Sequence, residues 1–420
     1  MTAPRPADEF VRDLLRVPAQ ERAALILGRL REELAGLVNV RPEALQAASP
    51  IPRIRLADGS LTVHPQALQV LQTALHRSLR VQIYLQELNA LATLGQLVAY
   101  LAPEFEAPPA TGGAPEIRPW PHPWSGSVGG PPVSNVALIL SSPRSGSTLL
   151  RAMLHGHPRL FAPPELNLMA FETMGQRAHW FSERGCGWLA KGLVTALAAA
   201  HRMPEAAARD QIRQWETTDT PVIDVYRSLV AGCGPALLVD KSPLYATHDG
   251  CILSALAHFE NVRLIHLVRH PHAVIESLVR MRFARVYAQG WPGWSPSPWR
   301  YADNVWWQAN ENIRTLLEQA PPGSQCTVRF EDLLARPAEV AADVCRHLGV
   351  DYHPGVLTPY DGNRLASTGA SAGPTLGDPN FLQHGRIESE RATEWRTIRL
   401  PFPMTTHTRE LAARFGYDPV

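Results

Sequence analysis

Val136-Ala137-Leu138-Ile139-Leu140-Ser141-Ser142-Pro143-Arg144-Ser145-Gly146-Ser147-Thr148 joins a short apolar run to a tight polar loop and the start of a helix. Five consecutive apolar residues bounded by polar ones are typical of a strand buried on both faces of a parallel sheet. Gly146 permits the sharp turn that follows, and the helix is predicted to begin at about Thr148. This stretch therefore predicts an α/β domain.

The remainder of the C-terminal part repeats the same order of strand, loop and helix. Strand-like stretches at 236–239, 262–268 and 327–330 predict further strands, and the helix after the last stretch is opened by Pro337 and closed by Gly349. Recurring strand and helix units indicate a parallel sheet flanked by helices on both faces. The predicted fold class is α/β with a P-loop-like sheet.

The first hundred residues have helical periodicity instead. Apolar positions near a 3.6-residue period predict helices over 21–37 and 65–79, with a last short helix over 91–101. Between Leu101 and Pro132 lie nine prolines and five glycines, a composition typical of a linker. The predicted organisation is an all-α helical bundle over 1–103, a linker over 104–134 and the α/β domain over 135–420.

The composition excludes several classes of protein. The 40 basic and 39 acidic residues give a net charge of +1, which argues against nucleic acid or an anionic membrane as a partner. No apolar run approaches the roughly 20 residues of a membrane helix, and Met1–Glu9 has no apolar core of a secretion signal. The five cysteines are scattered without a CxxC pair, which favours reduced thiols over a disulfide framework or a zinc site. A cytoplasmic protein is expected.

The loop from Ser141 to Thr148 is a candidate anion site. Ligands of parallel sheets bind beyond the carboxyl ends of the strands, and a helix N-terminus attracts negative charge through its free N–H groups. Arg144 adds a charged donor fork suited to phosphate or sulfate oxygens. The nucleotide loop GxxxxGK[ST] is not matched, because its first glycine and its lysine are missing. The pattern therefore disfavours kinases and ATPases.

Two more polar segments follow predicted strands. Arg269-His270-Pro271 ends the strand at 262–268, and Ser277 lies eight residues after Arg269, about two helical turns along. Asp240-Lys241-Ser242-Pro243 follows the strand at 236–239 and adds a second cation. A single segment of this kind is usually an ordinary turn or a surface charge. Three of them after three strands predict one shared anion site.

Together these motifs resemble the sulfotransferases of the Golgi and bacterial type, over about residues 135–417. Members of that family use 3′-phosphoadenosine 5′-phosphosulfate (PAPS) as the sulfuryl donor. The resemblance implies that the loop holds the 5′-phosphosulfate and that Arg269 and Ser277 bind the 3′-phosphate. The implied donor-binding residues are Arg144, Ser145, Gly146, Ser147, Thr148, Arg269 and Ser277.

The tyrosylprotein sulfotransferases extend the resemblance to catalysis. Their base is a glutamate 21 residues after the loop arginine and after a His-Pro pair, and here Glu165 follows His157-Pro158 at that spacing. Their Lys-Asp-Pro segment is similar to Lys241-Ser242-Pro243, with serine in place of aspartate. The resemblance implies that Glu165 is the base, that Lys241 and Arg144 stabilise charge, and that no metal takes part. The small-molecule sulfotransferases use a histidine instead, so four histidines near the motifs stay rival bases: His155, His157, His248 and His266.

The N-terminal part resembles an acyl or peptidyl carrier protein. Carrier proteins attach phosphopantetheine to the serine of a Leu-Gly-Leu-Asp-Ser-Leu segment, and the aligned segment here is 61–66, with His64-Pro65 in place of Asp-Ser. Proline has no hydroxyl group, so no phosphopantetheine is expected on this domain. Ser60 would serve only in a register that lengthens the spacing to the next helix by five residues.

A carrier-like domain joined to a sulfotransferase resembles the olefin-forming modules of polyketide synthases. In those modules the sulfotransferase modifies a β-hydroxyacyl chain held on a carrier protein. The resemblance implies a small-molecule or carrier-bound hydroxyl acceptor from bacterial secondary metabolism, and a biosynthetic synthase as a possible partner. The alternative is a catalytically inert, carrier-interacting scaffold that retains the fold. The intact set of motif residues favours the enzyme.

Overall fold

The computed structural model describes two compact units. Residues outside the described part are 1–6, 15, 57–58, 60, 80, 82, 84–87, 106–129, 184–186, 248, 283–297, 362–380, 382–383, 402 and 419–420. One unit comprises Met1–Pro115, Ile275–Ala302 and Arg399–Pro403. The other comprises Glu116–Val274, Asp303–Ile398 and Met404–Val420. Most of the predicted linker lies outside the described residues, and the predicted division at 103 and 134 stays a prediction.

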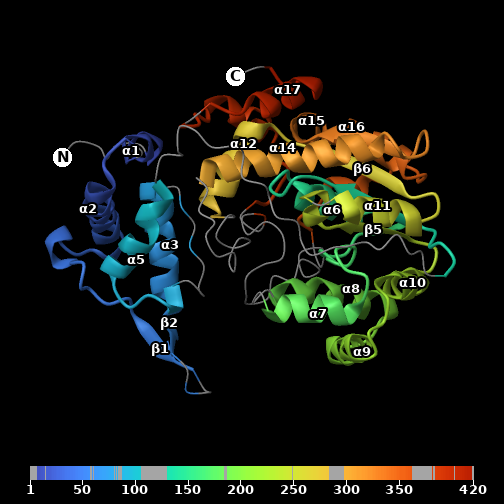
Figure 1. Cartoon of the computed structure of the whole chain (residues 1–420), viewed down its shortest axis with the longest axis horizontal. Helices are drawn as coiled ribbons and strands as arrows, with labels where there is room; N and C mark the ends of the chain where they lie inside the picture. The colour runs from blue at the N-terminus through green and yellow to red at the C-terminus, as the bar shows by residue number, and fades with distance from the viewer. Residues whose placement is uncertain are drawn as a thin grey trace. The chain divides into compact units, whose positions relative to one another are not determined.

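The N-terminal unit is built on packed helices. Helix α2 packs against α3 and α5 (Figure 1). The side chains of Ile26, Leu75 and Leu97 on these helices are fully buried. The three predicted helices are confirmed, and α1 adds one that the periodicity did not predict. The helices and 3₁₀ turns are α1 (Ala7–Leu14), α2 (Ala19–Val38), η1 (Pro42–Ala44), α3 (Pro65–Leu79), α5 (Leu94–Leu101) and η2 (Ala102–Phe105).

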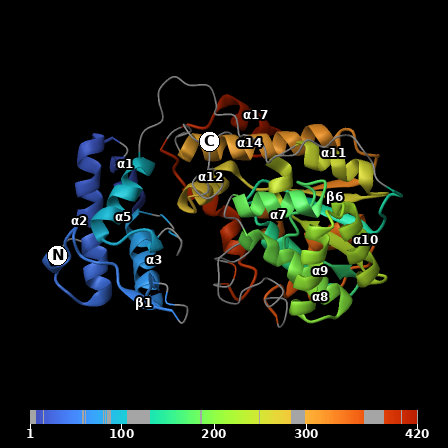
Figure 2. The ribbon, with the colours of Figure 1, turned by 60° about the horizontal axis from the view of Figure 1, so that its bottom comes forward.

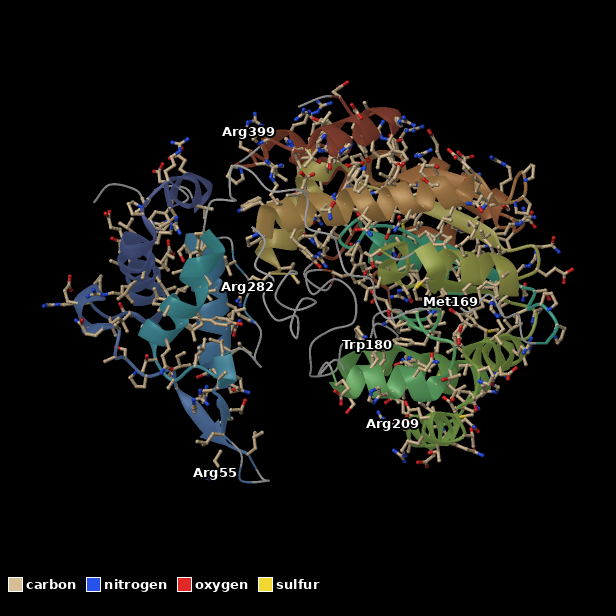
Figure 3. The ribbon with its side chains drawn as sticks, viewed as in Figure 1. Arg55, Met169, Trp180, Arg209, Arg282 and Arg399 are labelled. Atoms are coloured by element: carbon tan, nitrogen blue, oxygen red, sulfur yellow. The ribbon has the colours of Figure 1, made fainter. Side chains whose placement is uncertain are left out.

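This unit is not all-α as predicted. Strands β1 (Arg53–Arg55) and β2 (Leu61–Val63) form an antiparallel hairpin, with Ile54 opposite Thr62. Arg55, labelled in Figure 3, ends β1. Strands of three residues are too short for an alternating pattern to be recognised, which is why the prediction was wrong. The resemblance to a carrier protein stays a prediction.

The second unit contains the predicted parallel sheet. Its strands are β4 (Leu160–Phe161), β5 (Leu237–Lys241), β3 (Val136–Leu140), β6 (Arg263–Val268) and β7 (Gln325–Arg329), in that order across the sheet. Every neighbouring pair is parallel. The α/β prediction is therefore confirmed, and β3 has the predicted bounds. The two-residue β4 was not predicted.

Alternate residues of β3 enter two separate cores, as expected of a strand buried on both faces. Leu138 belongs to the core that includes residues of α8, α10, α11 and α14, whereas Ile139 belongs to the core formed with α6, α15 and α16.

Helix α8 packs on α9 and α10, and α7 on α9 (Figure 2). The helices are α6 (Ser147–His155), α7 (Met174–Glu183), α8 (Lys191–His201), α9 (Glu205–Thr217), α10 (Val222–Cys233), α11 (Asp249–His258), α12 (Pro271–Arg280), α14 (Pro298–Leu317), α15 (Phe330–Ala335), α16 (Pro337–His347) and α17 (Thr406–Arg414). The 3₁₀ turns of the C-terminal part are η3 (Gly187–Ala190), η4 (Pro243–Thr247), η5 (Pro354–Leu357) and η9 (Ser389–Thr397). Within the described residues, no helix is long and apolar enough to span a bilayer.

His266 is a hydrogen-bonded core histidine. It lies within β6, its Nε2 donates to Asn310 Oδ1 at 2.9 Å, and its ring meets Phe415 edge-on. Burial lowers the pKa of His266 to about 4. The folded state therefore keeps His266 neutral where the unfolded chain takes up a proton.

Acid is expected to destabilise the protein through His266. Because the unfolded state binds the extra proton, the free energy of unfolding should fall by about 3 kcal/mol as the pH decreases from ~6.5 to ~4. His266→Gln does not titrate and should lack this part of the pH dependence. Urea unfolding of both proteins at several pH values measures the difference, and parallel curves for the two would contradict the assignment.

Candidate functional site

The three polar segments predicted to share a site lie at one edge of the sheet. Strands β5, β3 and β6 are direct neighbours, and all run in the same direction. Their carboxyl ends are at Lys241, Leu140 and Val268. The parallel topology therefore brings the segment after β3 together with two segments that lie about a hundred residues or more further along the chain.

The loop after β3 has a conformation that depends on Gly146. Arg144 and Gly146 have positive φ angles of 69° and 87°. A Cβ atom at position 146 would lie 2.1 Å from the ring of Phe330, so only glycine fits. The Oγ atoms of Ser142 and Ser145 lie 2.7 Å apart. The loop is thus locked in one conformation immediately before α6 begins.

Ser141 also suits a ligand at this loop. Its Oγ is buried and has no hydrogen-bond partner among the described residues. Buried hydroxyl groups are usually paired, and the N-terminus of α6 follows six residues later with its free N–H groups. An unpaired hydroxyl beside a helix N-terminus fits an anionic ligand that would accept both kinds of hydrogen bond.

Arg269 connects this loop to the end of β6. Its Nη1 donates to the carbonyl oxygen of Arg144 at 3.1 Å, and its guanidinium lies 4.8 Å from the ring centre of Phe330. Trp306 Nε1 donates to the carbonyl oxygen of Arg269 at 2.9 Å. The structure therefore joins two residues that the sequence motifs had linked. The supporting roles of Phe330 and Trp306 had no local signal in the sequence.

His270, the residue after Arg269, is held by contacts with residues of the C-terminal part of the chain. The N–H of His270 donates to Glu331 Oε1 at 2.9 Å, and its ring stacks on Trp395 with centres 3.8 Å apart. Tyr417 donates to the other oxygen of Glu331 at 2.7 Å. Burial lowers the pKa of His270 to about 3, so it is uncharged at neutral pH. His270 acts here as a packing residue.

Ser277 lies on α12, the helix that begins at Pro271 directly after this segment. Its side chain is buried. Its position two turns along α12 is the predicted one, whereas its contact with a donor stays a prediction.

Glu165 and Lys241 form a direct ion pair. The Nζ atom of Lys241 donates to Glu165 Oε1, with side-chain exposures of only 2% and 12% respectively. Burial lowers the pKa of the Lys241 ammonium, and the charge of Glu165 opposes that shift. The structure thus joins two residues that are 76 positions apart and that were predicted to act together.

A second buried cation lies near this pair. Arg151, on α6, donates from Nη1 to the carbonyl oxygen of Ala162 at 2.8 Å. Burial lowers the pKa of Arg151 to about 10, and attraction to Glu165 counteracts part of that shift. Two cationic side chains, Lys241 and Arg151, therefore lie near the carboxylate of Glu165. No sequence motif marked Arg151, because an arginine within a helix is usually a surface residue.

The backbone after Glu165 is fixed by two helices. Arg177 of α7 is fully buried and donates to the carbonyl oxygens of Leu166 and Asn167, at 3.3 and 3.2 Å. Gly192 of α8 packs so closely that a Cβ atom there would lie 2.0 Å from the carbonyl oxygen of Glu165. Met169, at the end of this segment, is labelled in Figure 3. The position of Glu165 is therefore set by rigid elements.

The rival histidines have other contacts. His157 Nε2 donates to the carbonyl oxygen of Asp351 at 2.7 Å, and its Nδ1 accepts from the N–H of Arg159 at 3.0 Å, so both ring nitrogens have hydrogen-bond partners. His266 lies in the core, and the ring of His155 lies 6.1 Å from that of Phe161. His248 lies outside the described residues. Glu165 is therefore the base candidate that is paired with Lys241, and His155 stays a rival among the described histidines.

A metal site is not apparent at the described residues. No group of three or more His, Cys, Asp or Glu side chains among them could hold an ion. The predicted cations at this edge of the sheet are those of Arg144, Arg269 and Lys241, and the structure adds Arg151 near Glu165.

A family model and two of the similar proteins carry the name sulfotransferase. The model of a family described as the sulfotransferase family matches residues 137–354. The sulfotransferase domain of the Synechococcus PCC 7002 olefin synthase is 40% identical, with a TM-score of 0.61, over 69% of this chain and 96% of that domain. The sulfotransferase domain of the curacin biosynthetic pathway is 38% identical, with a TM-score of 0.62, over 70% of this chain and 99% of that domain. The nodulation protein NoeE of Sinorhizobium fredii is 25% identical over 314 residues, which are 68% of this chain and 67% of NoeE.

Proposed function

Since this chain belongs to the sulfotransferase family, we propose that it transfers a sulfuryl group from PAPS to a hydroxyl acceptor. The observation that carries the proposal is the buried ion pair of Glu165 and Lys241, near the edge of the sheet where the anion loop begins. Such a pair combines a proton acceptor with a cation in one rigid place, which is what transfer to an alcohol requires.

The proposed donor site is the loop and the segment linked to it. Backbone N–H groups at the start of α6, the Ser141 hydroxyl and Arg144 suit the 5′-phosphosulfate. Arg269 and Ser277 would bind the 3′-phosphate, which distinguishes PAPS from ordinary adenine nucleotides. When bound, the donor supplies the sulfuryl group and a phosphate that can leave.

The chain's own residues would promote an in-line displacement. Glu165 accepts the proton of the acceptor hydroxyl, whose oxygen forms the new bond to sulfur as the bond from sulfur to the bridging oxygen breaks. Protonation of Glu165 weakens its pairing with Lys241, so the ammonium charge becomes available to the bridging oxygen. Because the transition state is loose, positioning and fixed charge would supply most of the rate enhancement.

The proposed acceptor is a small-molecule or carrier-bound hydroxyl, such as a β-hydroxyacyl intermediate of bacterial secondary metabolism. Its support is the similarity to sulfotransferase domains of an olefin synthase and of the curacin pathway. A carrier-bound acceptor would be held on a carrier domain other than this N-terminal one, because His64-Pro65 replaces the Asp-Ser pair of carrier proteins. A biosynthetic synthase is the partner proposed on this ground.

Substitution of Ser277 tests the donor assignment. Ser277→Ala is expected to weaken binding of the product, 3′-phosphoadenosine 5′-phosphate, by about tenfold, the size of a lost hydrogen bond to a charged group. Binding of adenosine 5′-phosphate, which lacks the 3′-phosphate, should not change. Isothermal titration calorimetry measures both ligands, and Ser254→Ala, which also removes a buried hydroxyl group, is the control. Equal losses for both nucleotides would contradict the 3′-phosphate assignment.

A further inference from the structure

We propose that Asp240 and Tyr245 position Glu165 for catalysis. Asp240 orients neighbouring hydroxyl groups, and their oxygens accept hydrogen bonds from the backbone that follows Glu165. Both would be positioning residues without contact to the substrate. The inference deepens the proposed function and rests on it, because it takes Glu165 as the base.

Asp240 is buried and accepts hydrogen bonds from three hydroxyl groups. It lies beside Lys241 in β5 and is 1% exposed. Its Oδ2 accepts from Tyr226 at 2.5 Å and from Tyr245 at 3.1 Å, and its Oδ1 accepts from Ser242 at 2.9 Å. Burial raises the pKa of Asp240, and the hydrogen bonds from the three hydroxyl groups oppose that shift.

The charge of Asp240 fixes the direction of these hydrogen bonds. An ionised carboxylate only accepts, so each hydroxyl group must point its hydrogen toward Asp240. The oxygens of Ser242 and Tyr245 then have their lone pairs left for other donors. An amide at position 240 would offer hydrogens on one side and could reverse this order.

The oxygens of Ser242 and Tyr245 accept hydrogen bonds from the backbone two to four residues after Glu165. Ser242 Oγ accepts from the N–H of Asn167 at 3.1 Å. The Tyr245 hydroxyl accepts from the N–H groups of Leu168 and Met169, at 2.7 and 3.2 Å. Asn167 has a positive φ of 50°, an uncommon conformation that needs such support. The segment is thus bound from the β5 side through its N–H groups, while Arg177 holds its carbonyl groups.

Tyr226 provides a matched comparison. Its hydroxyl group donates to the same oxygen of Asp240, and the two tyrosine oxygens lie 3.4 Å apart. Both tyrosines are buried, and burial raises the pKa of both phenols. Tyr226 donates its hydrogen bond to Asp240, whereas the Tyr245 hydroxyl also accepts hydrogen bonds from the backbone. If both tyrosines only stabilised the core, removal of either hydroxyl group would have the same effect on the backbone after Glu165.

The test compares Tyr245→Phe with Tyr226→Phe in the full chain. Hydrogen–deuterium exchange of the peptide that contains Leu168 and Met169 should speed up in Tyr245→Phe and stay near that of the wild type in Tyr226→Phe. Turnover of PAPS with 3-hydroxyacyl thioester acceptors should fall about tenfold or more in Tyr245→Phe, and clearly less in Tyr226→Phe, because small displacements of a base are costly. Affinity for 3′-phosphoadenosine 5′-phosphate should be the same in both.

Equal effects of the two substitutions on exchange, or no effect of either, would overturn the inference. Asp240→Asn gives a further check, since it keeps the volume and should speed exchange at the same peptide. The proposed function fails separately, if wild-type protein neither binds the nucleotide nor transfers sulfuryl groups. In that case the exchange comparison still shows whether Tyr245 holds the backbone after Glu165, but a role in catalysis falls with the proposed function.

Discussion

Glu165→Gln is expected to lower the rate of sulfuryl transfer by ~10²–10⁴-fold while the protein still binds 3′-phosphoadenosine 5′-phosphate. The amide cannot take the proton of the acceptor hydroxyl, whereas the donor loop after β3 is untouched by the change. The substitution also leaves Lys241 buried without its counter-ion, so a lower melting temperature is expected. Stopped-time assays of nucleotide release, below that temperature, measure the effect.

The control for this experiment is Glu183→Gln, an exposed glutamate at the end of α7. It should leave both transfer and stability near the wild-type values. Retained turnover in Glu165→Gln would assign the role of the base to a histidine, with His155 and His248 as the candidates, because His157 and His266 are engaged in other hydrogen bonds.

Gly192→Ala is expected to reduce transfer by about 100-fold, because it displaces the backbone of Glu165. The added Cβ would lie 2.0 Å from the Glu165 carbonyl oxygen, and neither partner is a side chain that can rotate away. A displacement of about 1 Å at a catalytic group has a cost of this order. Steady-state turnover and the melting temperature are the measurements.

Gly28→Ala is the matched control for Gly192→Ala. Gly28 also lies within a helix, α2, but a Cβ atom there would meet nothing within 4 Å. Alanine should stabilise that helix by roughly 0.5–1 kcal/mol and leave transfer unchanged. If Gly192→Ala behaves in the same way as Gly28→Ala, the close packing of α8 on the Glu165 segment is contradicted.

Patterns within one stretch of chain were sufficient to predict the sheet. The run at 136–140 is apolar throughout because β3 is central and buried on both faces, so its bounds agree with the structure. The hairpin of β1 and β2 was missed because only Val63 of β2 is buried, and one buried residue makes no pattern. Two-residue β4 was missed for the same reason. Short elements are defined by their partners, which lie elsewhere in the chain.

The residues of the site also divide into those that the sequence could predict and those that it could not. Arg144 and Arg269 could be predicted because they follow strands directly, and strand order determines where such residues meet. Tyr245, Arg151 and Arg177 could not, since their partners lie on other elements and burial alone gives them a role at the site. The serine that replaces aspartate in Lys241-Ser242-Pro243 has a physical explanation only in three dimensions, where it links Asp240 to the Glu165 segment.

The most direct test of the central claim is the release of nucleotide from PAPS compared with adenosine 5′-phosphosulfate. Each donor is incubated with the protein and a panel of 3-hydroxyacyl thioesters, phenols and simple alcohols, and sulfated products are identified by mass spectrometry. The proposed function predicts transfer from PAPS that depends on an acceptor, and little or none from the donor without the 3′-phosphate. Equal use of the two donors would contradict the 3′-phosphate site, and no transfer from either to any acceptor would favour the inert scaffold.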